Sequence, residues 1–338
     1  MIYINMKKYK NLEGLICITY RCNAECQMCH IWKNPTKKSE EIKPEDLKTL
    51  PDMRATNVTG GEPFIRDDID EILDVLLPKT KRLVFSTNGF FTDRIMDIAE
   101  RYPEIGIRIS IEGLPKANDE LRGIKNGFDN GIRTLIELLH MGFKDIGFGI
   151  TVSDVNAKDL LELYHLAKAM KVEFATAVLH NSHYFNKSDN KIEKVDMVSN
   201  EFKKLVDELL KSKRPKDWYR AYFNYGIINR VNGVQRLLPC RMGTDAFFID
   251  PYGDVLPCNG MDKKVSMGNL KEKSFDEIWN SDRADEIRKK ASNCDKRCWM
   301  IGSVSPAMKK NFWNVTKWII KHKFLGEKIE IARLLEGQ

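Results

Sequence analysis

The sequence predicts an α/β fold, a partial (β/α)6 TIM barrel followed by a small C-terminal α+β domain, from two observations. Short apolar runs alternate with helix-like stretches over the first half of the 338-residue chain. Such alternation is typical of βαβ units that form a parallel sheet. Further on, a hairpin-like segment lies among four cysteines and indicates a second, smaller unit.

The elements of the predicted barrel can be placed in order along the chain. We expect strands at residues 15–20, 55–59, 82–86, 106–111, 146–151 and 172–178. We expect helices at residues 44–50, 68–77, 92–101, 127–141 and 157–170. Pro44 suits a first helical turn, and Asp67 and Asp68 are residue types that favour a helix start. Six units, where a complete barrel has eight, predict a partial barrel with its functional groups at the carboxyl ends of the strands.

Composition and charge restrict the function classes. The chain is 42% hydrophobic and 30% charged, as in ordinary globular proteins. Its net charge is +7, and residues 296–326 contain no Asp or Glu but seven basic residues, Lys296, Arg297, Lys309, Lys310, Lys317, Lys321 and Lys323. The remainder is nearly neutral, so we expect no nucleic-acid binding. No signal peptide and no membrane span are recognised, and the cysteines are grouped, so we expect a cytoplasmic protein.

Three cysteines directly after the first predicted strand indicate chemistry at iron. Cys22, Cys26 and Cys29 have the spacing Cys-x3-Cys-x2-Cys. Three thiolates on one loop can hold three irons of a [4Fe–4S] cluster and leave the fourth iron open. The alternatives are a zinc site, which usually takes two ligand pairs, and a redox dithiol, which needs Cys-x-x-Cys alone. The triplet fits neither alternative well.

A glycine-rich turn follows the second predicted strand. Gly60 and Gly61 allow the backbone to approach a ligand closely, and Glu62 offers a carboxylate to a ligand ammonium. A tight turn after a strand would explain this segment equally well if it stood alone. Met28, between the second and third cysteines, provides an apolar side chain that suits a cofactor ring.

Together, the motifs CNAECQMC at residues 22–29 and TGGEP at residues 59–63 resemble those of the radical S-adenosylmethionine (SAM) superfamily. The resemblance implies that the open iron chelates SAM, that Glu62 holds its amino group and that Met28 touches its adenine. It also implies reductive cleavage of SAM to methionine and a 5′-deoxyadenosyl radical that abstracts a substrate hydrogen. An external flavodoxin-like or ferredoxin-like electron donor is implied as a partner.

Further candidate residues follow later strands of the predicted barrel. In related enzymes a polar residue on the fourth strand contacts the SAM ribose and a following arginine contacts its carboxylate, which implies Ser110 and Arg122 here. A turn serine and a solvated arginine are the alternative. His180 and His183 follow the sixth strand, where either substrate contact or an ordinary surface loop explains them.

A second set of cysteines surrounds the predicted hairpin. Cys240, Cys258, Cys294 and Cys298 can bind zinc or an iron–sulfur cluster. Behind a radical SAM core, this pattern resembles the SPASM and shorter twitch extensions, which carry auxiliary [4Fe–4S] clusters. A full SPASM domain has seven cysteines, so the four here imply one auxiliary [4Fe–4S] cluster with all four ligands from the protein, able to relay an electron.

These patterns divide the chain into four parts. We expect the radical SAM core at residues 1–213, a connector at 214–236, the SPASM/twitch-like domain at 237–300 and a basic, aromatic helical tail at 301–338. Residues 309–325 of this tail resemble an interfacial membrane helix, which predicts peripheral membrane contact. A terminal helix packed on the barrel is the alternative.

Three functions are compatible with these motifs. The first is oxidation or other modification of a small hydroxylated, sugar-like or lipid-linked substrate by two clusters. The alternative is a peptide-modifying or protein-modifying SPASM maturase, against which stands the expectation that 21 residues before Cys22 leave no room for a leader-recognition domain. The third is a non-catalytic electron-transfer protein, which needs neither Gly-Gly-Glu-Pro nor a barrel.

Overall fold

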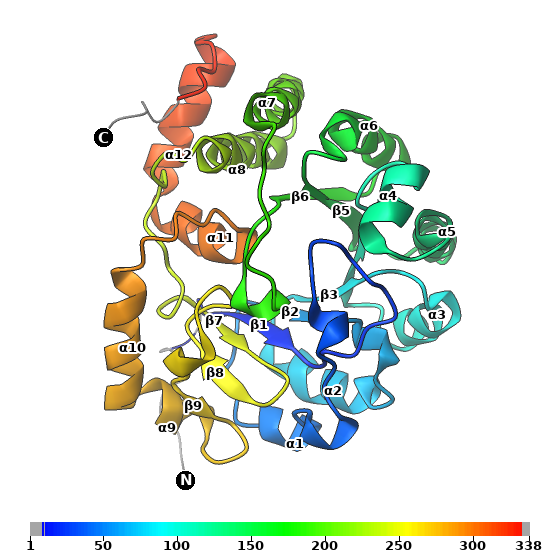
Figure 1. The fold of residues 1–338 in the computed structure, drawn as a ribbon, viewed down its shortest axis with the longest axis vertical. Helices are drawn as coiled ribbons and strands as arrows, with labels where there is room; N and C mark the ends of the chain where they lie inside the picture. Colours follow the sequence, from blue (N-terminus) through cyan, green and yellow to red (C-terminus); the bar gives the residue numbers. More distant parts are fainter. Residues whose placement is uncertain (1–8, 10, 333–338) are drawn as a thin grey trace.

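One nine-stranded sheet organises the molecule (Figure 1). A computed structural model describes residues 9 and 11–332. The strands are β1 (Glu13–Cys17), β2 (Ala55–Thr59), β3 (Leu83–Thr87), β4 (Gly106–Ser110), β5 (Ile146–Val152), β6 (Glu173–Val178), β7 (Ala246–Ile249), β8 (Asp254–Leu256) and β9 (Gly268–Asn269). Their order in the sheet is β6-β5-β4-β3-β2-β1-β7-β8-β9.

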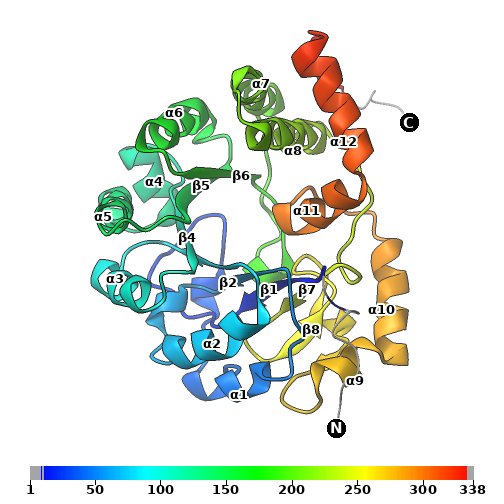
Figure 2. The same cartoon turned by 180° about the vertical axis from the view of Figure 1, so that it is seen from behind.

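The first six strands are parallel neighbours in chain order, and helices connect them. The first helices are α1 (Pro44–Leu47), α2 (Ile69–Leu76), α3 (Thr92–Arg101), α4 (Pro115–Arg122), α5 (Gly127–His140) and α6 (Leu160–Met170). They line the outside of the sheet (Figures 1 and 2). The predicted partial (β/α)6 barrel is therefore confirmed.

The later helices follow β6 and β9. They are α7 (Val195–Lys211), α8 (Pro215–Val231), α9 (Phe275–Trp279), α10 (Asp282–Ser292), α11 (Ile301–Lys310) and α12 (Phe312–Ile319). A π-helical turn at Ile320–Phe324 continues α12. Among the described residues, no helix is both long and apolar enough to cross a membrane.

The predicted boundaries of β2 and α3 agree with the structure, whereas other segments differ. The first strand begins at Glu13 and ends at Cys17, so Tyr20 lies beyond it. Helix α4 was not expected from the sequence. The expected connector at 214–236 contains the 17-residue helix α8, which packs on α7. Residues 1–8 and 10 of the expected core and 333–338 of the expected tail lie outside the described residues.

The C-terminal part extends the barrel sheet. β7 pairs in parallel with β1, with Glu13 opposite Ala246, and β8 pairs antiparallel with β7. The hairpin predicted among the cysteines is therefore present. The neighbouring helices α9 and α10 lie beside β7–β9 in both views (Figures 1 and 2). The C-terminal part thus lies at the edge of the barrel that β1 would otherwise leave exposed.

A buried tryptophan joins the C-terminal part to α8. Trp299 is fully buried, and its indole Nε1 donates a 2.7 Å hydrogen bond to the Phe223 carbonyl. Gly226 on α8 faces this ring. A Cβ atom at Gly226 would lie 2.0 Å from the nearest indole atom, so only glycine fits there.

We predict that Gly226→Ala lowers the free energy of unfolding by about 1–3 kcal/mol, because the added methyl overpacks a buried contact. Anaerobic urea unfolding of the apoprotein would measure the change. Gly302→Ala is the matched control, since a Cβ at this helical position meets nothing within 4 Å. The control should be neutral or stabilising by up to about 1 kcal/mol. Equal effects of the two substitutions would contradict this account of the α8–Trp299 contact.

Candidate active site

The loop that follows β1 carries three half-buried thiols close to one another. The pKa of Cys22 and of Cys29 is raised to about 12, mainly by burial and in part by neighbouring thiols of the same triplet. Burial also raises the pKa of Cys26. Three thiols that are so costly to ionise alone suit a bound cation, which stabilises thiolates.

Several contacts hold this loop in place. Arg21, directly before Cys22, forms a two-pronged ion pair with the buried carboxylate of Glu41, with both N–O distances 2.9 Å. On the other side, the Gln27 backbone donates a 2.9 Å hydrogen bond to the Leu121 carbonyl of α4. The loop is therefore fixed at both ends, to the β1–β2 connection and to the helix that follows β4.

Glu62 lies beyond β2 with its carboxylate completely buried. It accepts hydrogen bonds from Thr87 Oγ1 (2.8 Å), from the Asn88 backbone (2.7 Å) and from the Phe64 backbone (3.1 Å). Burial raises the pKa of Glu62, and these donors oppose that shift. A carboxylate has about four acceptor positions, so three donors leave about one for a ligand ammonium.

The two glycines before Glu62 bring β2 against the cysteine loop. A Cβ atom at Gly61 would lie 2.3 Å from the Arg21 carbonyl oxygen and 2.9 Å from Cys22 Cβ. At Gly60 it would lie 2.8 Å from the Thr19 carbonyl oxygen. The lack of a side chain at Gly60 and Gly61 therefore lets the backbone after β2 pack directly against the backbone after β1. This packing places Glu62 beside the thiols.

Arg122 and its partner Glu112 form a second buried charged group next to the cysteines. Arg122 Nη1 lies 3.3 Å from Glu112 Oε1, and both side chains are buried. Burial disfavours the guanidinium charge, but nearby Cys26, Glu112 and Cys22 raise the pKa of Arg122 overall. The arginine predicted from sequence thus lies beside the thiols and Glu62, and is not a solvated surface residue.

The remaining predicted cofactor residues occupy the same end of the sheet. Ser110 is the last residue of β4 and is half-buried. Met28 is half-buried in the cysteine loop, and its carbonyl accepts a 2.9 Å hydrogen bond from Asn190 Nδ2. Sequence reasoning missed Tyr184, whose buried hydroxyl donates a 2.7 Å hydrogen bond to the Gly60 carbonyl. No local motif marks this long-range contact.

The second set of cysteines is gathered by the hairpin and by α10. The pKa of Cys258 is raised to about 11, mainly by burial and in part by Cys240 and Cys298. Burial is the largest cause that raises the pKa of Cys298, and Cys294 and Cys240 raise it to a smaller extent. Cys240 and Cys294 are exposed. All eight cysteines are free thiols, and among the described residues no His, Cys, Asp or Glu side chains form a three-membered group for a single metal ion.

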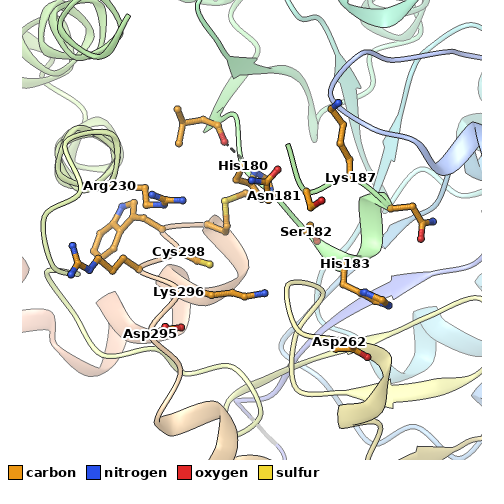
Figure 3. Close-up of a pocket in the computed structure, with 16 residues that line it drawn as sticks. His180, Asn181, Ser182, His183, Lys187, Arg230, Asp262, Asp295, Lys296 and Cys298 are labelled. Carbon is orange, nitrogen blue, oxygen red and sulfur yellow. Dashed lines mark hydrogen bonds between the residues drawn. The ribbon is translucent and has the colours of Figure 1, made fainter. Parts of the chain in front are cut away.

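A cavity of about 630 Å³ lies beyond the carboxyl end of β6, and Cys298 of the second set lines it (Figure 3). Its lining includes His180, His183 and Lys187 from the loop after β6, Arg230 from α8, and Cys298. The loop after β6 also carries Tyr184 and Asn190, which contact Gly60 and Met28. The loop that lines one side of the cavity therefore also contacts the backbone of the first cysteine site, and Cys298 on the lining belongs to the second set.

The residues present fit the cofactors that the sequence motifs imply. Three free, half-buried thiols share one loop, and buried Glu62 and Arg122 place one anionic and one cationic group beside them. Free SAM carries an ammonium and a carboxylate, which these two groups complement. Four further free thiols lie in the C-terminal part, and one of them, Cys298, lines the cavity.

Comparisons with known proteins agree with this site. The family model of the Radical SAM superfamily matches residues 16–167, and that of the SPASM iron–sulfur cluster-binding domain matches residues 240–299. The Fe-coproporphyrin III synthase of Methanosarcina barkeri is 26% identical over 308 residues, which cover 80% of this chain and 73% of the relative. The mycofactocin maturase MftC of Mycolicibacterium smegmatis is 25% identical, covering 84% of this chain and 75% of the relative.

A third relative and two solved structures add to the comparison. The subtilosin biosynthesis protein AlbA of Bacillus subtilis is 26% identical, and the match covers 78% of this chain but only 58% of AlbA. Native anSMEcpe with bound AdoMet has a TM-score of 0.62 at 16% identity, covering 91% of this chain and 99% of that one. Streptococcus suis SuiB has a TM-score of 0.63 at 20% identity, covering 86% and 72%. These structural matches show a shared fold.

The matched domains establish the cofactors at the level of the family. The Radical SAM domain binds SAM and a [4Fe–4S] cluster, and the SPASM domain binds auxiliary iron–sulfur clusters. Both lie where the structure gathers free thiols, one set in each matched region. The chain is therefore an enzyme of the radical SAM superfamily with a C-terminal SPASM domain.

Proposed function

We propose that this radical SAM enzyme modifies a peptide or protein substrate in the cavity beyond β6. The observation that carries this proposal is the position of the cavity, which Cys298 lines on one side and the loop contacting Met28 and Gly60 lines on the other. A substrate held there lies within reach of both sites. The relatives AlbA and MftC, named for subtilosin biosynthesis and mycofactocin maturation, favour a peptide over a small hydroxylated molecule.

Different residues of this chain hold the first cluster and bind SAM. Cys22, Cys26 and Cys29 hold the first cluster, which when bound supplies the electron that cleaves SAM to methionine and a 5′-deoxyadenosyl radical. Glu62 orients the SAM ammonium through its remaining acceptor position. Arg122 binds the SAM carboxylate while Glu112 holds the guanidinium in place.

The second site acts from the other wall of the cavity. Cys240, Cys258, Cys294 and Cys298 are the proposed ligands of the auxiliary cluster, which leaves no ligand position for substrate if all four bind. This arrangement suits passage of an electron between substrate and an external flavodoxin-like or ferredoxin-like protein. The relative named as Fe-coproporphyrin III synthase makes a tetrapyrrole the second candidate substrate.

We predict that the triple variant Cys22/Cys26/Cys29→Ala loses SAM cleavage and about four of about eight irons per chain. After anaerobic reconstitution, iron analysis and 5′-deoxyadenosine formation under dithionite would measure both. Cys17→Ala is the control, because this buried thiol lies on β1, outside the triplet, and donates to the Thr19 carbonyl. It should keep its iron content. A fully loaded wild type that forms no 5′-deoxyadenosine would refute the proposed radical chemistry.

We further propose that the C-terminal helical segment contacts an anionic membrane surface. Trp313, Ile320 and Phe324 are 73%, 45% and 61% exposed, and exposed Lys317 lies among them at helical spacing. Aromatic side chains beside lysines on one helix face are typical of interfacial binding. The absence of Asp and Glu from residues 296–326 adds charge complementarity to anionic lipids.

We predict that the protein sediments with phosphatidylglycerol vesicles and that the double variant Trp313→Ala/Phe324→Ala lowers the bound fraction several-fold. The loss follows from removing the apolar area that would enter the lipid. Val155→Ala is the control, since Val155 is a 51% exposed apolar residue outside this segment. Equal sedimentation with and without vesicles would argue against membrane contact.

A further inference from the structure

The cavity beyond β6 contains a guanidinium to which the proposed chemistry gives no role. Arg230 lies in the last turn of α8 and is half-buried. Its side chain extends from α8 into the cavity towards His180 and Asn181 (Figure 3). Within the part of the chain that the structure describes, no hydrogen bond or ion pair reaches this guanidinium. A partly desolvated charge without a partner is costly, which makes Arg230 a candidate for ligand binding.

The other cations that line the cavity already have partners. Lys187 Nζ lies 2.7 Å from Asp189 Oδ1. Lys296 Nζ donates a 2.6 Å hydrogen bond to the Gly260 carbonyl. Arg297 donates to the backbone carbonyl of Gly233. These contacts distinguish Arg230 from the remaining positive charges of the lining.

The carboxylates of the lining do not neutralise Arg230. Asp262 and Asp295 are both exposed. Asp262 Oδ1 accepts a 2.9 Å hydrogen bond from the Lys264 backbone, and no ion pair joins Asp262 or Asp295 to Arg230 among the described residues. The cavity therefore presents an unbalanced positive charge to whatever occupies it.

A neutral imidazole lies next to this charge. His180 Nδ1 lies 3.0 Å from the Val178 carbonyl oxygen, which can only accept, so Nδ1 carries the proton. Burial lowers the pKa of His180, and the charge of Arg230 lowers it further, although the bond to Val178 opposes the shift. Nε2 is then an acceptor. The cavity thus combines an anion-binding donor fork with a nearby hydrogen-bond acceptor.

We propose that Arg230 binds a carboxylate of the peptide substrate inside this cavity, an inference that rests on the proposed function. The planar fork of arginine matches the two oxygens of a carboxylate, and partial burial strengthens the pair relative to one in water. The carboxylate belongs either to the C-terminus of the peptide or to an Asp or Glu side chain. Both present the same group to Arg230.

Stabilisation of the auxiliary cluster is the competing role for this arginine, and Arg236 is a second candidate for that role. Arg236 lies among three of the proposed ligands, because Cys240, Cys298 and Cys294 all raise its pKa against the larger lowering effect of burial. Burial raises the pKa of Cys298, and Arg230 lowers it more than Arg236 does. Both arginines therefore lie near the auxiliary site, and the iron content of the Arg230 variants separates this role from carboxylate binding.

Three short peptides test the proposal on the reconstituted holoenzyme. The probes are N-acetyl-trialanine with a free carboxylate, its C-terminal amide, and N-acetyl-Ala-Glu-Ala amide. Ligand-observed NMR titration under anaerobic conditions would give the Kd of each for wild type, Arg230→Gln, Arg230→Lys and Lys187→Gln. Lys187→Gln removes the same charge from the same lining, but from a lysine already paired with Asp189.

We predict that wild type binds a carboxylate peptide about tenfold or more tightly than the neutral amide, as expected for a charge-assisted hydrogen bond. Arg230→Gln should abolish this preference, Arg230→Lys should keep part of it, and Lys187→Gln should change it less than about twofold. Preference for trialanine would identify a C-terminal carboxylate, and preference for the Glu peptide a side chain.

Several results would overturn the proposal. These are equal affinity of wild type for all three peptides, binding of none, or an unchanged carboxylate preference in Arg230→Gln. Loss of auxiliary iron from Arg230→Gln with its carboxylate preference intact would instead assign the residue to the cluster. The proposed function is judged separately, because a wild type without SAM cleavage refutes it whatever the peptide affinities are.

Discussion

Backbone pairing between β1 and β7 is the interaction on which the arrangement of the site depends. β1 lies between β2 and β7 and leads directly into the cysteine loop, so the same strand positions the first thiols and the C-terminal part. The chain after β8 then reaches the loop after β6, where Ser182 and the Tyr184 backbone both donate to the Asn259 carbonyl. Tyr184 also reaches Gly60. The open edge of the barrel is thereby bridged by a loop that contacts both halves.

The sequence predicted those parts of the fold that local pattern controls. Strand–helix alternation gave the six parallel strands, and the turn residues between 249 and 254 gave the hairpin, because both signals are contained in a few neighbouring residues. The pairing of β7 with β1 joins segments more than 200 residues apart and has no such signal. Helix α8 was missed because buried residues such as Tyr222, Phe223 and Ile227 lie around much of its circumference, which obscures the amphipathic period.

In the candidate site, too, local motifs were predicted from the sequence and contacts between distant segments were not. The cysteine spacing and Gly-Gly-Glu-Pro are local, so they could be recognised before the structure was known. The donors to Glu62 from Thr87 and Asn88, and the partner of Arg122, depend on neighbouring strands ending at one edge of the sheet. Arg230 could not be predicted, because its significance lies in the partners it lacks among the described residues, which only the packed structure reveals.

The two cysteine sites differ in how much of their geometry the folded chain supplies. The first three thiols share one loop of eight residues that is fixed by ion pairing and by backbone hydrogen bonds on both sides. The other four come from three segments, and Cys240 and Cys294 remain exposed. A cluster that joins segments so far apart in the sequence restricts the chain more than a cluster that fills a preformed loop. Cluster binding at the second site therefore orders the chain more than cluster binding at the first site does. Because Cys298 directly precedes Trp299, which packs on α8, that ordering also reaches the cavity wall that carries Arg230.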